Sequence, residues 1–404
     1  MIYMNRTILL LLVALCYQAA VFAQEETGAY INGIYYDTYF DTKEMKSCAE
    51  VAYGKYPDGY PSGDIVVEGK VVINGKEYEV KQIGMFAMDW VKPNTKVSLP
   101  NGIYILQDHC FGSPYNGKRI DLDMNFGNIE LLYVGCLSSA KLPDEVYMPK
   151  VRSIGPNTLV DVTTKKLVLG GNLSSVGWCA FSGSMIEELV FEDGTHADYF
   201  NGMNPYLSNN AFRGMRIKEL KLPKWQNMAI GDCVVDENID LERVVFPDVP
   251  SIEYGYNDYV YKNVTSIQPV YGYFFMECPN LTEVVCLGAV PPVITEIDDF
   301  ADRKCYKPTN ATSFEFMDNI DDCVLKVPAG SEELYRADPV WGKFKTIYGF
   351  ENGDYTSIVM PEVVAPETEA VPVYHNLQGM KVERPEHGQL YIRTVGSRTD
   401  KVVY

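Results

Sequence analysis

Hydrophobic and polar positions along this chain alternate in short stretches that recur at a nearly fixed interval. Residues 211–223 read AFRGMRIKELKLP and residues 180–192 read AFSGSMIEELVFE, so the two align without a gap. In each copy a small residue and a Phe lead to a turn at Gly183 or Gly214, and apolar side chains then alternate as in a short strand with one buried face. Such a unit can bury that face only against further copies. A period of roughly 20–30 residues therefore predicts a solenoid of the leucine-rich type.

The same one-sided pattern predicts one strand in each repeat. Proline, which lacks the backbone donor of a sheet, ends several of these strands. Strands are predicted at residues 96–99, 119–123, 145–148, 166–169, 188–191, 219–222, 243–246, 282–287 and 323–327. Bends are predicted at Ile154-Gly155, Val176-Gly177, Ile230-Gly231 and Ile252. Three intervals along the array are longer than one repeat, which predicts insertions at about residues 193–209, 251–266 and 288–322.

A third copy, at residues 275–287, reads FMECPNLTEVVCL. With it the sequence resembles the BspA-like leucine-rich repeat family of bacterial surface proteins, whose unit reads approximately I-G-x-x-A-F-x-x-C-x-x-L-x-x-I-x-L-P. The resemblance implies a β-rich solenoid of short parallel strands, bends and few short helices, with a β-rich N-terminal cap and a small β module at the C-terminus. Phe181 and Phe212 occupy the same place in the gap-free match, so we expect both to be buried.

The array is expected to carry a cap at each end, because the terminal repeats would otherwise expose an apolar face. Residues 24–80 are rich in Tyr and turn residues, contain a hairpin signal at Asn74-Gly75, and resemble the family's N-terminal cap. Residues 81–350 hold the repeats and a closing segment that also resembles the family's. In that segment a short helix is predicted at residues 331–335, with Ser331 as its N-cap.

Composition changes after the array. Residues 351–372 contain prolines and glutamates without a regular period, which suits an extended linker. Residues 373–404 return to strand-like alternation and resemble a short C-terminal module common in secreted proteins of gut and oral anaerobes. The resemblance implies a role in export, sorting or anchoring.

The N-terminus predicts export. Residues 1–23 have the pattern of a signal peptide, with a positive charge at Arg6, an apolar run at residues 8–15, and small residues at the ends of Val21-Phe22-Ala23. An alternative is an outer-membrane lipoprotein attached through Cys16, although Leu precedes this Cys where a lipobox has a small residue. The expected location is the cell surface or the extracellular space.

Charge narrows the classes of partner. The formal net charge of −19 argues against a nucleic-acid binder, which needs a basic face to displace counterions. It equally disfavours adsorption to an anionic membrane. After the first 23 residues no apolar run approaches the ~18 residues of a spanning helix, so no membrane-spanning segment is expected.

Motifs for catalysis or cofactor binding do not emerge from the sequence. The chain has four His and shows no H-E-x-x-H, G-x-S-x-G, P-loop or G-x-G-x-x-G pattern. His109 and Cys110 are adjacent, but neighbours on a strand or turn point apart. Cys110, Cys179, Cys233 and Cys278 each fall in the turn of a repeat, which predicts small buried apolar side chains; export leaves an occasional disulfide possible. We expect no enzyme and no cofactor.

Asp121, Asp123 and Asn125 have the spacing of the first ligands of an EF-hand calcium loop. An EF-hand loop needs Gly at its sixth position and a bidentate Glu at its twelfth, where this chain has Phe126 and Leu132. The alternation favours a repeat strand with an acidic, solvated outer face, and no metal site is expected.

Four tyrosines crowd the predicted insertion at 251–266: Tyr254, Tyr256, Tyr259 and Tyr261. Rigid amphipathic rings can anchor a sugar or a protein at low entropic cost, so they are candidate binding residues. The alternative is that half of them pack the loop against the solenoid.

Together these patterns predict a non-enzymatic exported surface protein that uses its repeat array for protein–protein recognition. The resemblance implies adhesion to host matrix proteins or to other cells. The alternative is a glycan-binding or accessory surface protein of a polysaccharide-uptake system, because a fold does not determine its ligand.

Overall fold

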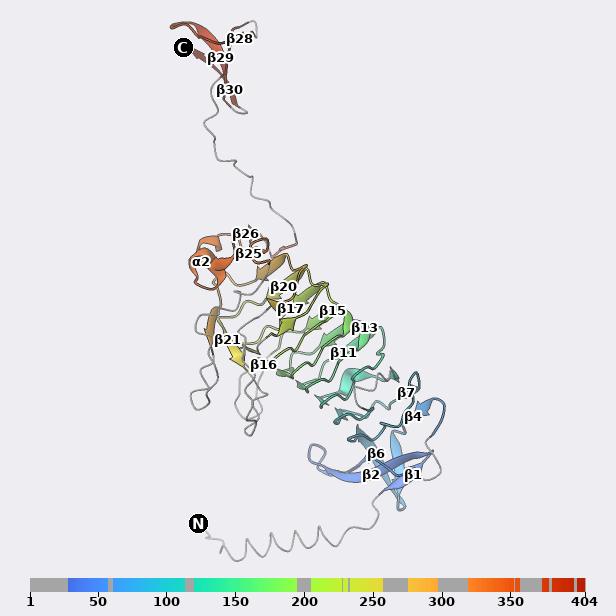
Figure 1. The fold of residues 1–404 in the computed structure, drawn as a ribbon. Helices are drawn as coiled ribbons and strands as arrows, with labels where there is room; N and C mark the ends of the chain where they lie inside the picture. Colours follow the sequence, from blue (N-terminus) through green and yellow to red (C-terminus); the bar gives the residue numbers. More distant parts are fainter. Residues whose placement is uncertain are drawn as a thin grey trace, which may run out of the picture. The chain divides into compact units, whose positions relative to one another are not determined.

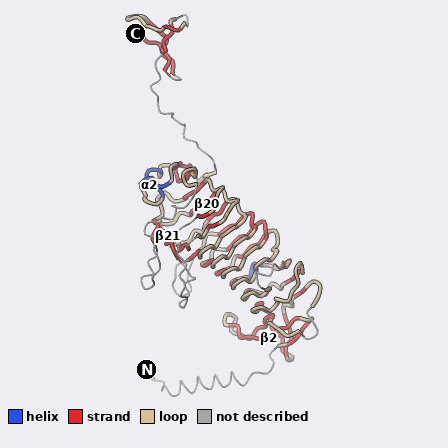
Figure 2. The backbone as a smooth tube through the Cα atoms, in the orientation of Figure 1, coloured by secondary structure: helices blue, strands red, loops and turns tan. Residues whose placement is uncertain are grey.

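The computed structural model describes most of the chain. The described residues are 28–56, 61–112, 120–194, 205–226, 228–231, 233–256, 275–296, 319–351, 353–356, 373–377, 380–395 and 398–403. The chain divides into two compact units, Met1–Ser357 and Ile358–Tyr404 (Figure 1). In the first unit, short parallel strands follow one another as a leucine-rich repeat solenoid, which confirms the predicted fold class (Figure 2).

Antiparallel strands open the first unit. β1 (Ala29–Ile31), β2 (Ile34–Asp41) and β3 (Lys46–Val51) form a meander, and β3 then pairs in parallel with β6 (Lys76–Ile83). β5 (Lys70–Ile73) joins β6 in the predicted hairpin, where Asn74 and Gly75 adopt φ of 52° and 77°.

A buried carboxylate in the N-terminal cap binds the cap to the first repeats. Asp41, at the end of β2, is 2% exposed. It accepts hydrogen bonds from the hydroxyls of Tyr39, at 3.1 Å, and of Tyr104. Tyr104 precedes a repeat strand, so the bond joins the cap to the array.

One ladder of parallel strands runs through all the repeats, and we call it the inner ladder. It continues from β6 through β8 (Ile105–Leu106), β10 (Leu131–Leu132), β12 (Ser153–Ile154), β14 (Ser175–Val176), β16 (Tyr206–Leu207), β18 (Met228–Gly231), β21 (Ser251–Tyr256) and β24 (Val293–Glu296). Most of these strands have only two residues. In register, Ser153 pairs with Ser175, 22 positions later, and the two hydroxyls lie 2.8 Å apart.

The inner ladder corrects two sequence predictions. The bend predictions are wrong for Ile154, Val176, Ile230-Gly231 and Ile252, which lie in β12, β14, β18 and β21. In β12 and β14 two residues are too few to show alternation. Each predicted insertion also contains a ladder strand: β16, β21 and β24. Within the three intervals, residues 195–204, 257–266 and 297–318 lie outside the described residues.

A second set of parallel sheets carries the strands predicted from the sequence, and their solvent side is called the outer face. The first sheet is β4 (Ile65–Val66), β7 (Lys96–Ser98) and β9 (Asp121–Asp123); the second is β11 (Glu145–Met148), β13 (Thr163–Leu169) and β15 (Met185–Phe191). The third is β17 (Glu219–Lys221), β20 (Arg243–Phe246), β23 (Glu283–Cys286), β25 (Val324–Pro328) and β26 (Thr346–Phe350). Every predicted strand is present to within a few residues.

In several turns between the ladders, two residues four positions apart adopt left-handed backbone conformations. The second residue of the pair is the predicted turn glycine in two repeats: Gly183 has φ of 68° and Gly214 has φ of 62°, where a side chain would add strain. The turns also bond to one another: Gly183 N donates to Arg213 O at 2.9 Å. Beside them β19 (Val235–Asp236) pairs with β22 (Phe275–Met276). The same pair of conformations recurs at residues 135 and 139, 157 and 161, 179 and 183, 210 and 214, and 233 and 237.

A helical segment closes the array. α2 (Glu332–Ala337) lies at the predicted place, and its buried Tyr335 donates a hydrogen bond to Gly288 O at 2.8 Å. Ser331 is the N-cap residue, as predicted, but its dihedrals are helical and its side chain makes no capping hydrogen bond, whereas a capping residue is typically extended. The carboxylate of Glu332 instead accepts from Gly330 N at 2.7 Å. Two 3₁₀ turns, η2 (Phe126–Asn128) and η4 (Trp341–Lys343), complete the helical elements of the described residues.

The second unit is a small antiparallel sheet in the order β28-β27-β29-β30. Its strands are β27 (Val373–His375), β28 (Lys381–Val382), β29 (Leu390–Val395) and β30 (Arg398–Val403). Tyr391 is 7% exposed and packs edge-on against Tyr374, with ring centroids 6.2 Å apart. In neither unit does a described helix have the length and apolar character to cross a membrane.

Candidate binding surfaces

Charged side chains of successive repeats form an ionic ladder on the outer face. Arg243 of β20 donates to Glu219 of β17 at 2.8 Å and to Glu283 of β23 at 2.5 Å. Lys221 lies 3.1 Å from Glu219, and Lys326 lies 2.9 Å from Glu283. Glu219, Arg243 and Glu283 are Cα partners in the parallel register, so each charge faces an opposite one across the strands.

This arrangement keeps the two carboxyls ionised. Burial alone would raise the pKa of Glu219, but hydrogen bonds from Arg243 and Lys221 outweigh it and lower that pKa. The pKa of Glu283 is lowered in the same way, against burial, by Lys326 and Arg243. Lys326 is 5% exposed, so loss of its partner would leave a charge in poor contact with water.

After β26 the chain turns back across the outer face, in a segment (residues 353–356) that we call the strap. Tyr355 of the strap packs with Phe350 over the outward-facing Val245 and Val285. The two aromatic rings meet edge-on at 6.1 Å between centroids. Val245 and Val285 are 2% and 0% exposed, although both lie on the solvent side of their strands.

Cations also hold the strap. Lys326 donates to the carbonyl oxygen of Tyr355 at 3.0 Å. The Tyr355 ring lies 5.8 Å from Lys221 Nζ and 5.8 Å from Arg243 Cζ, within range of a cation–π interaction. The sequence places Tyr355 in the linker at 351–372; the structure seats it on the array.

The sheet β11-β13-β15 carries a similar outward pattern. Tyr147, Val168 and Val190 are Cα partners and form one column. Tyr147 is 51% exposed, and the two valines are half-buried. The phenol of Tyr147 donates to Glu192 at 3.3 Å.

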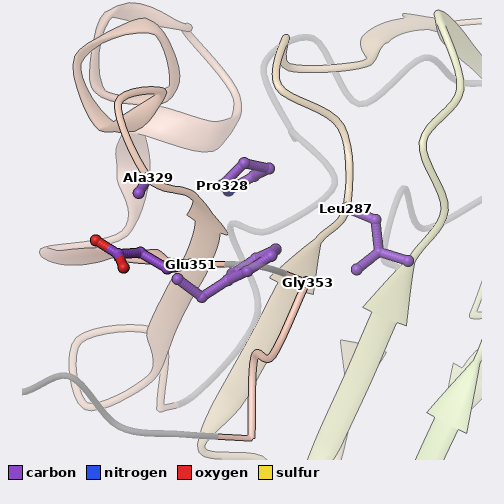
Figure 3. A pocket seen from close by; sticks show the side chains of 6 residues that line it. Leu287, Pro328, Ala329, Glu351 and Gly353 are labelled. Carbon is purple, nitrogen blue, oxygen red and sulfur yellow. The ribbon is translucent and has the colours of Figure 1, made fainter.

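A shallow hollow of about 390 Å³ opens beside the strap (Figure 3). Leu287 lies on one side of it, across from Glu351. Its lining residues are Leu287, Pro328, Ala329, Phe350, Glu351 and Gly353. Glu351 is the one ionisable residue of this lining, so the hollow offers no acid–base pair.

The predicted tyrosine site is only partly within the described residues. Tyr254 lies in β21, where it pairs with Ile230 of β18, and Tyr256 pairs with Gly231 after a register shift. Tyr259 and Tyr261 fall outside the described residues, so the binding role of the four tyrosines stays a prediction.

His109 and Cys110 do not form a nucleophile pair. His109 adopts φ of 47° and stacks on Phe86 at 5.5 Å between centroids. Cys110 is fully buried, its thiol donates to Cys136 O at 3.5 Å, and burial raises its pKa well above the ordinary value. A thiol in this state is inert.

The other described cysteines follow the prediction for repeat turns. Cys179, Cys233 and Cys278 are buried and not disulfide-bonded, as are Cys48, Cys136, Cys286 and Cys323.

The acidic stretch at Asp121–Asp123 forms the repeat strand β9 with a solvated outer face. The sequence favours this strand over a calcium-binding loop. Asp123 lies 2.8 Å from Lys96, and Asp121 lies 3.5 Å from Lys141. Asn125 accepts from Gly127 N at 2.8 Å and so caps a 3₁₀ turn. Throughout the described ranges, no group of three or more His, Cys, Asp or Glu is arranged to hold a metal ion.

Comparison with known proteins confirms the predicted resemblance. Residues 73–187 match the model of the BspA type leucine rich repeat region, in six copies. This part of the chain, from β5 into β15, is a BspA-type leucine-rich repeat region. No curated protein sequence matches the chain.

Three solved structures are similar to this chain. A leucine rich cell surface protein from Faecalibacterium prausnitzii A2-165 has 12% identity and a TM-score of 0.28, covering 83% of this chain and 97% of its own. A leucine-rich repeat protein from Bacteroides ovatus ATCC 8483 has 12% identity and a TM-score of 0.27, covering 78% and 98%. The pneumococcal vaccine antigen PcpA has 11% identity and a TM-score of 0.24, covering 80% and 98%.

Sequence patterns did not reveal the strap or the ionic ladder beneath it. A signal was present: RVVF at 243–246 and EVVC at 283–286 place a second Val at a position that should face solvent. An apolar residue on the solvent side of two neighbouring strands indicates that something covers it.

Proposed function

We propose that this protein is an exported, non-enzymatic surface protein that recognises other proteins through its repeat array, in adhesion to host matrix proteins or to other cells. The observation that carries the proposal is the outer face. Two three-stranded parallel sheets and one five-stranded parallel sheet form it, and within each sheet the outward side chains of paired strands form columns. Such a surface suits a large, flat protein partner better than a small molecule.

Charge and chemistry support the same proposal. The net charge of −19 favours a neutral or basic partner. A signal peptide at residues 1–23 would deliver the array to a place where such partners occur. The BspA-type repeat region at 73–187 agrees with a role in protein binding.

Screening the mature chain, residues 24–404, against arrays of matrix proteins, bacterial cells and glycans tests this function. We expect saturable binding to at least one protein. Binding to glycans alone would favour the alternative of a glycan-uptake accessory protein.

Within this proposal the tyrosine stretch is a candidate anchor. Truncating a buried aromatic anchor typically costs about 2 kcal/mol or more of binding. The double substitution Tyr256→Ala and Tyr259→Ala should therefore lower the affinity for the partner found in the screen at least tenfold. Unchanged affinity would place the contact elsewhere on the array.

A further inference from the structure

Two groups of three strands present the same arrangement of side chains on the outer face. In β17, β20 and β23 the first outward column is Glu219, Arg243 and Glu283. In β11, β13 and β15 the corresponding column is Glu145, Lys166 and Glu188. In each group a cation lies between two carboxylates, and Lys166 approaches Glu188 to 2.8 Å.

The second outward column, two residues further along each strand, matches as well. It contains Lys221, Val245 and Val285 in the group β17, β20 and β23. It contains Tyr147, Val168 and Val190 in the group β11, β13 and β15. In both groups a valine follows the central cation and a second valine lies on the next strand.

The two groups differ in what covers them. Tyr355 of the strap lies on Val245 and Val285, which are 2% and 0% exposed. In the other group Val168 and Val190 are half-buried and Tyr147 is 51% exposed. The strap, which forms turns at Gly353, Tyr355 and Thr356, thus shows within this chain which chemistry such a surface binds: an aromatic ring placed on two valines beside a cation.

We propose that the column Tyr147, Val168 and Val190 is a docking site for a segment of a partner protein that presents an aromatic side chain, as the strap presents Tyr355. The partner's ring packs on the two valines next to Lys166, as Tyr355 packs next to Arg243. This proposal names a surface for the protein recognition proposed above and so rests on it.

Charge around the site defines the partner further. Glu145, Glu187 and Glu188 are exposed on these strands. Lys166 is paired with Glu188, and Lys165 with Asp144 at 2.6 Å. Carboxylates therefore exceed cations here, and the flanking residues of the bound segment are expected to be neutral or basic.

Selection from a displayed library of random ten-residue peptides on the full chain tests the proposal. We expect enrichment of peptides with a Tyr, Phe or Trp flanked by Lys or Arg. The Val168→Glu variant should lose this enrichment at least tenfold, because a carboxylate would replace the apolar contact. Tyr147→Ala is the second variant, and Val72→Glu, at an exposed valine of β5, is the matched control.

Each other outcome overturns the proposal. Absence of aromatic enrichment, or enrichment that survives both Val168→Glu and Tyr147→Ala with the fold intact by circular dichroism, would remove the site. Self-association of the chain that Val168→Glu abolishes would assign the surface to a second copy. A protein found by array screening that binds Val168→Glu with unchanged affinity would leave the proposed function standing and remove this site alone.

Discussion

The rings of Phe181 and Phe212 stack with their centroids 5.4 Å apart and an angle of 29° between their planes, and both side chains are fully buried. They occupy the same place in consecutive repeats, and the backbone N–H of Phe181 donates to Ala211 O at 2.8 Å. Stacking of this kind makes each repeat the cover of its neighbour.

Phe212→Ala should lower the free energy of unfolding by about 3–5 kcal/mol, because a ring cavity would open between two repeats that hydrogen bonds keep in place. Denaturant titration measures the change. Phe40→Ala, at a residue that is 59% exposed, is the matched control and should change stability little. A midpoint for Phe212→Ala within error of the wild type would refute the assignment of this ring to the core.

Arg243→Met should destabilise the array by about 1–3 kcal/mol at neutral pH, since it leaves the carboxylates of Glu219 and Glu283 without their shared donor. Thermal unfolding at pH 7 tests this, with Lys218→Met as a control because Lys218 pairs with Glu242 at an exposed site. An equal effect of both substitutions would mean that the ladder is no more important than a surface ion pair.

The same ladder predicts a dependence on pH. The pKa values of Glu219 and Glu283 are lowered in the folded state, so the stability that they contribute is present above the ordinary carboxyl value of 4.5 and is lost as pH falls through the folded pKa values. The difference between wild type and Arg243→Met should therefore shrink between pH 5 and pH 2. A constant difference over that range would contradict the role assigned to these two carboxyls.

The pKa of Asp236 is shifted in the opposite direction from those of Glu219 and Glu283. Burial, and then the charge of Glu237, raise its pKa to about 6, against the attraction of Arg213. A raised carboxyl pKa means that stability is present below the unfolded value of 3.8 and is lost as pH rises through about 6. Asp236→Asn should therefore stabilise the array by about 1–2 kcal/mol at pH 7.5 and by less at pH 4. Thermal unfolding of the wild type and of Asp236→Asn at the two pH values measures this difference. Destabilisation by Asp236→Asn at pH 7.5 would show that the ion pair with Arg213 outweighs the cost of burial.

The strap predicts where the array ends. A chain that stops at Ser357 should unfold at the same midpoint as the full chain, because the strap is retained and the second unit is separate. A chain that stops at Asp354 should still fold but lose about 1–3 kcal/mol, because Val245 and Val285 lose the Tyr355 cover. If both truncations unfold alike, the strap contributes nothing; if both lose cooperativity, the C-terminal part belongs to the core.

Sequence reasoning found the outer-face strands because their three to seven residues show alternation, as in Glu145–Met148 and Arg243–Phe246. It missed the inner ladder because a strand such as Ser175–Val176 has too few residues for any period, and only the register with its neighbours identifies it. The strap was missed because Tyr355 contacts Val245 and Val285 across large sequence separations. The tyrosine site could be proposed from composition, but its register beside Ile230 comes from the structure.

The measurement that tests the central claim most directly is the affinity of residues 24–404 for the protein found by array screening, before and after enzymatic removal of that protein's glycans. Recognition of protein by the outer face predicts a Kd that changes less than twofold, with a salt dependence that reflects the acidic surface. Loss of binding on deglycosylation would contradict protein recognition and make the array a glycan-binding surface.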